Sequence, residues 1–471
     1  MVNPNAFAWL MLLIWPLVAW VLYSRTSADK ALIWTVLWGY LLLPPLVAIN
    51  LPVVPDLDKE TIPNLAALAM VLFVLKDRLS FLPQSLLGKV LIALFVLSPF
   101  ATVLTNGDQI WFGALNLQGM RIYDSVAAVT NQAIALLPFF LARRYLASDD
   151  AMRHLVVALV VAGLVYSVPM LVETRLSPQM NVWVYGFFQH DFFQTIRFGG
   201  YRPVVFLPHG LWVAFFALMT VLSALVLFRV GPAENRPRYG AALLYLGVVL
   251  VLCKSAGPLV YALAIAPLIL IAPRRGQVLV AALLAVLVVA YPLLRGAHLV
   301  PLDRIVDIAQ GIDPNRALSL QFRITNEENL LTRAAERPWF GWGGYGRNLI
   351  YDPITGQGTS IADGAWIITM GIYGRLGYLA LFGLLALPLV LMGHEALRQN
   401  GAAFSRFTCA VALIFAANLV DLLPNATLVP FTWLMAGALL GNVEAMALAR
   451  RKAALIGWQA KLNPSPSRTV L

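Results

Sequence analysis

The chain has 471 residues, of which 60% are hydrophobic and only 12% are charged, and its mean hydropathy is +0.76. A soluble globular protein carries about 25% charged residues and a disordered one is poor in apolar residues, so both classes are excluded. The net charge is +11. With so little polar surface, this charge does not indicate a nucleic-acid-binding protein, and we expect no nucleic acid as a partner. The composition predicts an all-α, polytopic bundle of transmembrane helices in a lipid bilayer.

Thirteen apolar stretches are candidates for helices that cross the bilayer, and we expect 12 or 13 of them to do so. A crossing helix needs about 20 apolar residues, or fewer when polar residues flank it. The stretch 61–75 is the weakest because it is short, and 6–23 lacks the basic start of a cleaved signal peptide. In chain order the stretches are roughly 6–23, 31–50, 61–75, 88–105, 125–142, 154–172, 203–228, 239–253, 257–272, 276–294, 364–392, 407–420 and 428–443.

The distribution of Lys and Arg between the connections predicts the orientation, because these residues accumulate on the cytoplasmic side. One alternating set of connections holds most of them, including Arg143, Arg144, Arg274 and Arg275. This set is therefore predicted to be cytoplasmic, which places the N-terminus outside. The predicted organisation is N-terminal transmembrane helices at 1–294, a large periplasmic loop at 295–362, C-terminal transmembrane helices at 363–443 and a basic cytoplasmic tail at 444–471.

The long connection between 295 and 362 differs from the short loops elsewhere, and loops of this length are usually functional. Residues Asn315–Arg337 are expected to form an amphipathic helix, which Pro338 ends. The segment Trp339–Gly346 (WFGWGGYG) follows as a glycine-rich turn with aromatic side chains suited to a membrane interface.

Polar residues gather at the predicted outer ends of the spans, whereas the span interiors are nearly free of ionisable groups. A transporter usually carries such groups near the middle of the bilayer, so the pattern favours chemistry at the outer boundary. Four segments stand there: Arg202–Gly210, with Arg202 at a helix start and His209 two turns further in; Lys254–Pro258; the loop helix with Arg323; and Asp363–Trp366.

These residues suit a phosphorylated lipid as substrate. A guanidinium matches phosphate oxygens with two parallel hydrogen bonds, so Arg202 and Arg323 are candidate phosphate ligands, with Lys254 and His209 beside them. The carboxylate of Asp363 is a candidate base for a sugar hydroxyl. Each has a structural alternative: Arg202 as an interface anchor, His209 as a structural histidine and Asp363 as a helix N-cap. No metal-ligand pattern is present, and Cys253 and Cys409 indicate neither a disulfide framework nor a metal site, so no cofactor is expected.

Four segments in this order resemble the bacterial O-antigen ligase and O-antigen polymerase superfamily of membrane glycosyltransferases. They are RPVVFLPHGLWVAFF (202–216), KSAGPLVYALAIA (254–266), FRITNEENLLTRAAERPWFGWGGYG (322–346) and DGAWIITMGIYGRLGYLALFGLL (363–385). The resemblance covers roughly residues 150–440. Two positions depart from the family: Ala256 replaces the Arg of its Ser-Arg-Gly turn, and Asp363 stands where the ligases carry a His.

The resemblance implies a metal-independent, inverting glycosyltransferase of the bacterial inner membrane, with its active site facing the periplasm. Its donor would be an undecaprenyl-pyrophosphate-linked glycan and its acceptor a sugar hydroxyl. Arg202, Lys254, Arg323 and His209 would bind the donor pyrophosphate, while Asp363, Arg202 and Arg323 would be catalytic. Polymerase is preferred to ligase because of Asp363. Two other classes stay open: a flippase or transporter of lipid-linked oligosaccharides, and a non-enzymatic scaffold of envelope polysaccharide assembly.

Overall fold

The computed structural model describes residues 3–50, 55–78, 81–312, 314–398 and 404–462, and confirms an all-α polytopic bundle. Its α-helices are α1 (Ala6–Arg25), α2 (Ala28–Leu42), α3 (Thr61–Phe73), α4 (Leu86–Leu104), α5 (Ile122–Ala135), α6 (Leu137–Tyr145), α7 (Asp149–Leu176), α8 (Met180–Tyr185), α9 (Gly210–Val230), α10 (Arg236–Leu252), α11 (Ala256–Ile271), α12 (Arg274–Gly296), α13 (Leu302–Ile312), α14 (Pro314–Glu336), α15 (Ala365–Arg398), α16 (Arg406–Asp421) and α17 (Pro430–Leu462). Two 3₁₀ turns, η1 (Phe192–Thr195) and η2 (Ala233–Asn235), complete the helical elements.

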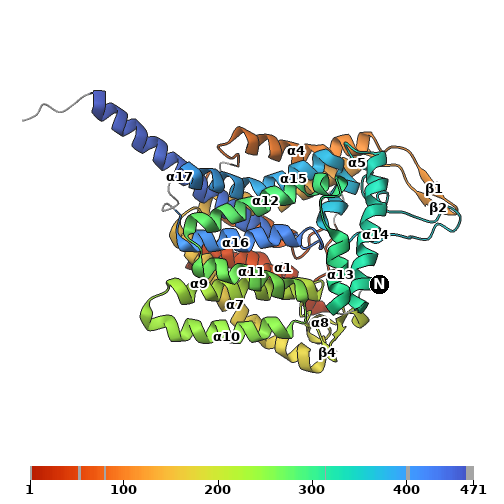
Figure 1. Cartoon of the computed structure of the whole chain (residues 1–471), viewed down its shortest axis with the longest axis horizontal. Helices are drawn as coiled ribbons and strands as arrows, with labels where there is room; N and C mark the ends of the chain where they lie inside the picture. The colour runs from red at the N-terminus through yellow and green to blue at the C-terminus, as the bar shows by residue number, and fades with distance from the viewer. Residues whose placement is uncertain (1–2, 51–54, 79–80, 313, 399–403, 463–471) are drawn as a thin grey trace, which may run out of the picture.

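The long helices lie roughly side by side, and the hairpin strands lie at one end of the bundle (Figure 1). At that end α13 and α14 run across the ends of the other helices, and the N-terminus lies beside them (Figure 1). Two short antiparallel hairpins connect helices: β1 (Ile110–Phe112) with β2 (Leu115–Leu117), and β3 (Ile196–Arg197) with β4 (Gly200–Tyr201). Helix α17 leaves the bundle at the opposite end (Figure 1).

Every predicted span corresponds to a helix, although their lengths differ. Eight helical segments of the described residues are long and apolar enough to cross a membrane: α1, α4, α5 with α6, α7, α9, α12, α15 and α17. The other five predicted spans correspond to the shorter helices α2, α3, α10, α11 and α16, which have 13 to 17 residues. By length alone eight segments qualify, and the predicted 12 or 13 spans are reached only if the shorter helices also cross the membrane.

Prolines explain two of these differences, because proline lacks the N–H that a helix interior needs. The stretch predicted as 31–50 ends at Leu42, just before Pro44 and Pro45. The stretch predicted as 125–142 divides into α5 and α6 at Leu136, with Pro138 in the first turn of α6.

The long connection contains the predicted amphipathic helix, which is α14, and a second helix, α13, that the sequence analysis did not identify. Helix α12 ends at Gly296, so the loop begins slightly later than the predicted boundary at 295. The predicted tail 444–471 begins as the last turns of α17, which continue to Leu462, and residues 463–471 lie outside the described residues.

The glycine-rich turn packs into a break in helix α15. At Gly374 the backbone is not helical, with φ at 68° and ψ at −166°. Backbone N–H groups of Trp342 and Gly343 in the turn donate to the carbonyls of Gly371 and Ile372, at 2.8 and 2.9 Å. The turn therefore supplies the hydrogen bonds that the broken helix loses. Membrane proteins tolerate irregular backbone only where it is satisfied in this way.

Replacing Gly374 by Ala is expected to lower the free energy of unfolding by about 2–4 kcal/mol. The new Cβ would clash with the glycine-rich turn, and the alanine would have to adopt a positive φ that is strained for any residue with a Cβ. An added Cβ would lie 2.5 Å from the carbonyl carbon of Trp339. The measurement is denaturant unfolding in detergent. Gly247→Ala in α10 is the control, since that position has nothing within 4 Å of the new Cβ. Equal stability of the two variants would contradict the prediction.

Candidate functional site

The segment from Arg202 to His209 is not helical, which corrects the prediction that a helix begins at Arg202. Helix α9 begins at Gly210, and His209 is its N-cap, with Nδ1 accepting a hydrogen bond from the Leu211 N–H at 2.9 Å. His209 therefore does not lie two turns inside a helix. Pro203 and Pro208 favour the irregular path. Gly210 leaves room for the Arg202 side chain, because a Cβ there would lie 2.1 Å from the Arg202 Cδ.

Buried side chains hold this irregular segment in place. The Glu173 carboxylate on α7 accepts from the backbone N–H groups of Val204 and Val205, at 2.7 and 2.8 Å. Lys59 donates to the Phe206 carbonyl at 2.8 Å, and Gln189 donates to the carbonyl of Val205 at 2.9 Å. Val205 has a φ of 53°, a conformation that is costly for a β-branched residue. Strained backbone that several buried groups maintain is typical of functional sites.

The charges of several arginines act on His209. Burial lowers its pKa to about 3, and the neighbouring His190 together with the charges of Arg202, Arg323 and Arg197 contribute. The two imidazole rings meet edge to face, with centroids 4.3 Å apart. Because Nδ1 accepts a hydrogen bond, the neutral ring carries its proton on Nε2, which is then a hydrogen-bond donor.

Arg323 also pairs with Asp363, although the two residues come from separate elements. Their closest atoms, Nε of Arg323 and Oδ2 of Asp363, are 3.3 Å apart, and both side chains are about 40% exposed. Arg323 is on α14, and Asp363 lies two residues before the first residue of α15. The carbonyl of Gly364, not of Asp363, accepts the first helical hydrogen bond of α15, so Asp363 lies just outside the N-cap position.

A second carboxylate stands beside this pair. Glu327 follows Arg323 by one turn of α14, and its Oε1 accepts from the Trp366 indole N–H at 3.2 Å. Burial raises the pKa of the Glu327 carboxyl, and the charge of Asp363 raises it further against the opposing effects of Trp366 and Arg295. The site therefore offers two carboxylates in different environments, one ion-paired and exposed, the other partly buried.

Lys254 lies at the margin of this group. Its Nζ donates to the carbonyl of Arg197 at 3.0 Å, in the β3–β4 hairpin that leads to Arg202. The amine thus fixes the hairpin that carries Arg197, whose charge acts on His209. The structure consequently brings Arg202, His209, Arg323 and Asp363 to one end of the bundle. Lys254 is connected to this group through its contact with Arg197.

Sequence reasoning missed several residues of this arrangement. Glu327 could have been found, since it is four positions after Arg323 on the predicted helix and therefore on the same face. Arg197 and His190 lie in a connection that the prediction treated only as a loop. The roles of Glu173 and Lys59 could not be predicted from the sequence, because their hydrogen-bond partners in the 202–209 segment are distant in the chain.

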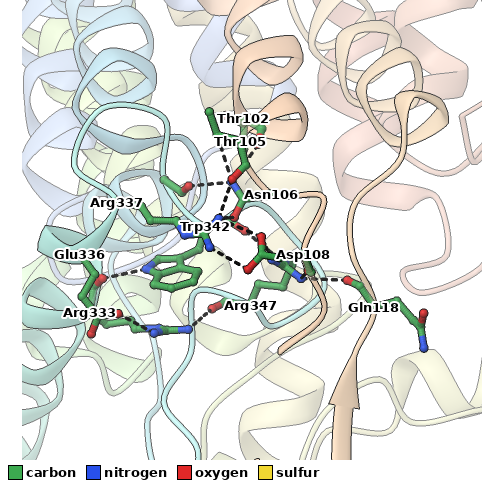
Figure 2. Close-up of polar contacts among 11 residues, drawn as sticks. Thr102, Thr105, Asn106, Asp108, Gln118, Arg333, Glu336, Arg337, Trp342 and Arg347 are labelled. Atoms are coloured by element: carbon green, nitrogen blue, oxygen red, sulfur yellow. Dashed lines mark hydrogen bonds and ion pairs between the residues drawn. The ribbon is translucent and has the colours of Figure 1, made fainter. Parts of the chain in front are cut away.

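The other arginines of the long loop form a separate structural cluster around Trp342 (Figure 2). The guanidinium carbons of Arg333 and Arg337 lie 3.4 and 4.1 Å from the centre of the indole. Arg337 and Arg347 both pair with Asp108, at 2.8 and 3.3 Å. Burial alone would raise the pKa of Asp108, but these arginines hold it below its usual value. The cluster joins the long loop to the end of α4.

Arg347 is the buried centre of this cluster and is 0% exposed. It donates to the backbone carbonyls of Trp342, Asp108 and Gln118, at 3.1, 2.9 and 2.9 Å (Figure 2). With its donors occupied in this way, Arg347 is a structural residue and not a phosphate ligand.

Within the described residues, no group of three or more His, Cys, Asp or Glu side chains is placed to hold a metal ion. No protein-family model matches the chain, and no curated protein matches it significantly. The function therefore has to be inferred from the site itself.

Proposed function

We propose that the chain is a glycosyltransferase at the outer face of the bacterial inner membrane, using an undecaprenyl-pyrophosphate-linked glycan as donor. The observation that carries the proposal is the ion pair between Arg323 and Asp363 at one end of the bundle, together with the charges of Arg202 and Arg323 that act on the nearby His209. Such a group suits an anionic leaving group and a hydroxyl nucleophile together. It lies at the end of a bundle with apolar flanks, where a lipid-linked substrate can reach it.

The donor pyrophosphate would bind between the two arginines. Guanidinium groups neutralise phosphate charge with bidentate hydrogen bonds, and the His209 Nε2–H adds a neutral donor without adding charge. The N-terminus of α9, which begins at Gly210, adds partial positive charge. These contacts strengthen as the leaving pyrophosphate gains negative charge in the transition state.

The acceptor hydroxyl would be activated by Asp363. Its oxygen attacks the anomeric carbon of the donor while its proton passes to the carboxylate. The bond between that carbon and the phosphate oxygen breaks, and the electron pair leaves with undecaprenyl pyrophosphate. The anomeric configuration is inverted because attack and departure occur on opposite sides. Binding of the pyrophosphate draws Arg323 away from Asp363 and so frees the Asp363 carboxylate to act as the base. Glu327 would then take over the proton that Asp363 has received.

Replacing Arg202 by Lys tests the pyrophosphate contact. We expect the apparent donor affinity to fall about 10-fold, because Lys keeps the charge but loses the bidentate geometry worth about 1.5 kcal/mol. The measurement is the dependence of transfer rate on the concentration of lipid-linked donor in vesicles. Arg175→Lys, at the exposed end of α7, is the matched control and should behave as wild type. An unchanged donor affinity in Arg202→Lys would count against the contact.

A further inference from the structure

Three cavities form a row along the end of the bundle that carries the site. The first, of about 370 Å³, lies between the glycine-rich turn and the segment Ser360–Ala362, which directly precedes Asp363. The second, of about 340 Å³, shares Gly344 and Tyr345 with the first and extends along α5. The third, of about 270 Å³, shares Asn131 and Ala135 with the second and reaches the starts of α3 and α17. We call this row the outer groove.

Small residues on one face of α5 make the room for the second cavity. Ala127, Ala128, Asn131 and Ala135 line it, and these positions follow a helical spacing. The next residue, Gln132, lines it as well. The opposite wall is the glycine-rich turn with Tyr345, whose hydroxyl donates to Asp124 of α5 at 3.2 Å.

Neutral polar and aromatic side chains line much of the groove, and three carboxylates, those of Asp58, Glu60 and Asp124, line its second and third cavities. Amide groups stand at Asn64, Asn131 and Asn348, and aromatic rings at Tyr373 and Trp433. No Lys, Arg or His is among the described residues that line the three cavities, whereas the neighbouring site around His209 is rich in arginine. The groove therefore does not suit a phosphate, and its polar groups do not suit a polyprenyl tail.

Two of the buried amides that line the groove have oxygen atoms without a partner among the described residues. Gln132 is 8% exposed and Asn64 is 2% exposed, and neither Oε1 of Gln132 nor Oδ1 of Asn64 accepts a hydrogen bond. Such buried acceptors are costly unless a ligand or water donates to them. Hydroxyl groups of a sugar are suitable donors, and aromatic rings cover the apolar faces of pyranoses.

We propose that the outer groove binds the acceptor as an extended, uncharged oligosaccharide, with its reactive end at Asp363 and its older sugar units along α5. The inference rests on the proposed function and makes it more specific. An acceptor that extends over three cavities would carry several sugar units, and this length favours a polymerase, whose acceptor is itself a repeat-unit glycan.

Blocking the groove tests the proposal in the native host, with variants replacing the chromosomal copy. Ala135→Phe fills the junction of the second and third cavities, and Ala133→Phe makes the same change on an exposed position of the same helix that does not line them. We expect Ala135→Phe to lower the most abundant length of the surface polysaccharide at least 2-fold, while Ala133→Phe leaves it unchanged. The readout is the length distribution on a gel, together with the amount of variant protein in the membrane.

Asn131→Leu is the second variant if Ala135→Phe fails to accumulate, because it removes an amide without adding bulk. It should shorten the glycan in the same direction. An unchanged length distribution in both variants would contradict the proposal that the groove binds the acceptor. An equal loss of all lengths would also contradict it, because that result is expected if the groove holds a lipid tail. Asp363→Asn separates the two inferences: if it abolishes the polymer while the groove variants behave as wild type, only the groove proposal fails.

Discussion

Replacing Asp363 by Asn is expected to lower sugar transfer about 10²–10⁴-fold, the range lost when a general base is removed. An amide keeps the size of the side chain beside Arg323 but cannot take the proton of the acceptor hydroxyl. The variant should remain folded and inserted, because the Arg323–Asp363 pair is about 40% exposed on both sides and such pairs contribute little to stability. The measurement is the rate of transfer from a lipid-linked donor at fixed protein amount.

Two further variants make this result specific. Asp303→Asn on α13 removes an exposed carboxylate from the same loop and should leave the rate unchanged. Glu327→Gln tests the second carboxylate. A base with a raised pKa must lose its proton to act, so activity that depends on Glu327 would rise with pH through a value above the usual range of Glu, and Glu327→Gln would remove that rise. Full activity of Asp363→Asn would exclude Asp363 from the chemistry.

Replacing Arg347 by Met is expected to produce the largest loss of stability in the chain, about 3–5 kcal/mol. The side chain is fully buried, and its removal leaves the carbonyls of Trp342, Asp108 and Gln118 without their donor. The long loop would then separate from the end of α4. Denaturant unfolding in detergent measures the effect.

Arg304→Met is the matched control, since Arg304 is exposed on α13 and the same substitution there should change the free energy of unfolding by less than about 0.5 kcal/mol. A loss below 1 kcal/mol for Arg347→Met would show that the cluster around Trp342 does not hold the loop. This outcome would leave the proposed chemistry unaffected, because the cluster is separate from Arg323 and Asp363.

The helices of the bundle were predictable because each corresponds to an apolar stretch, and α14 was predictable because Pro338 ends it, whereas α13 was not predicted. The sequence did not reveal the break in α15. Gly371, Gly374 and Gly377 are compatible with close helix packing, and only the docking of the glycine-rich turn shows that Gly374 interrupts the helix. A break that depends on a partner segment about 30 residues earlier in the chain has no local signal.

The candidate site was predictable in composition but only partly in geometry. Basic and acidic residues at the ends of apolar stretches identified Arg202, Arg323 and Asp363. Their arrangement depends on buried contacts such as those of Glu173, which hold the Arg202 segment in an irregular and not a helical path. Pairing between Arg323 and Asp363 likewise depends on how α14 lies against α15, which periodicity does not specify.

The most direct test is to incubate the purified protein, in vesicles, with a chemically defined undecaprenyl-pyrophosphate oligosaccharide and no added metal. We predict release of undecaprenyl pyrophosphate together with lipid-linked glycans that grow by whole repeat units, with inversion at the new linkage. Asp363→Asn should give neither product. A wild-type protein that leaves the donor intact, or moves it across the bilayer without forming a new glycosidic bond, would contradict the proposed function.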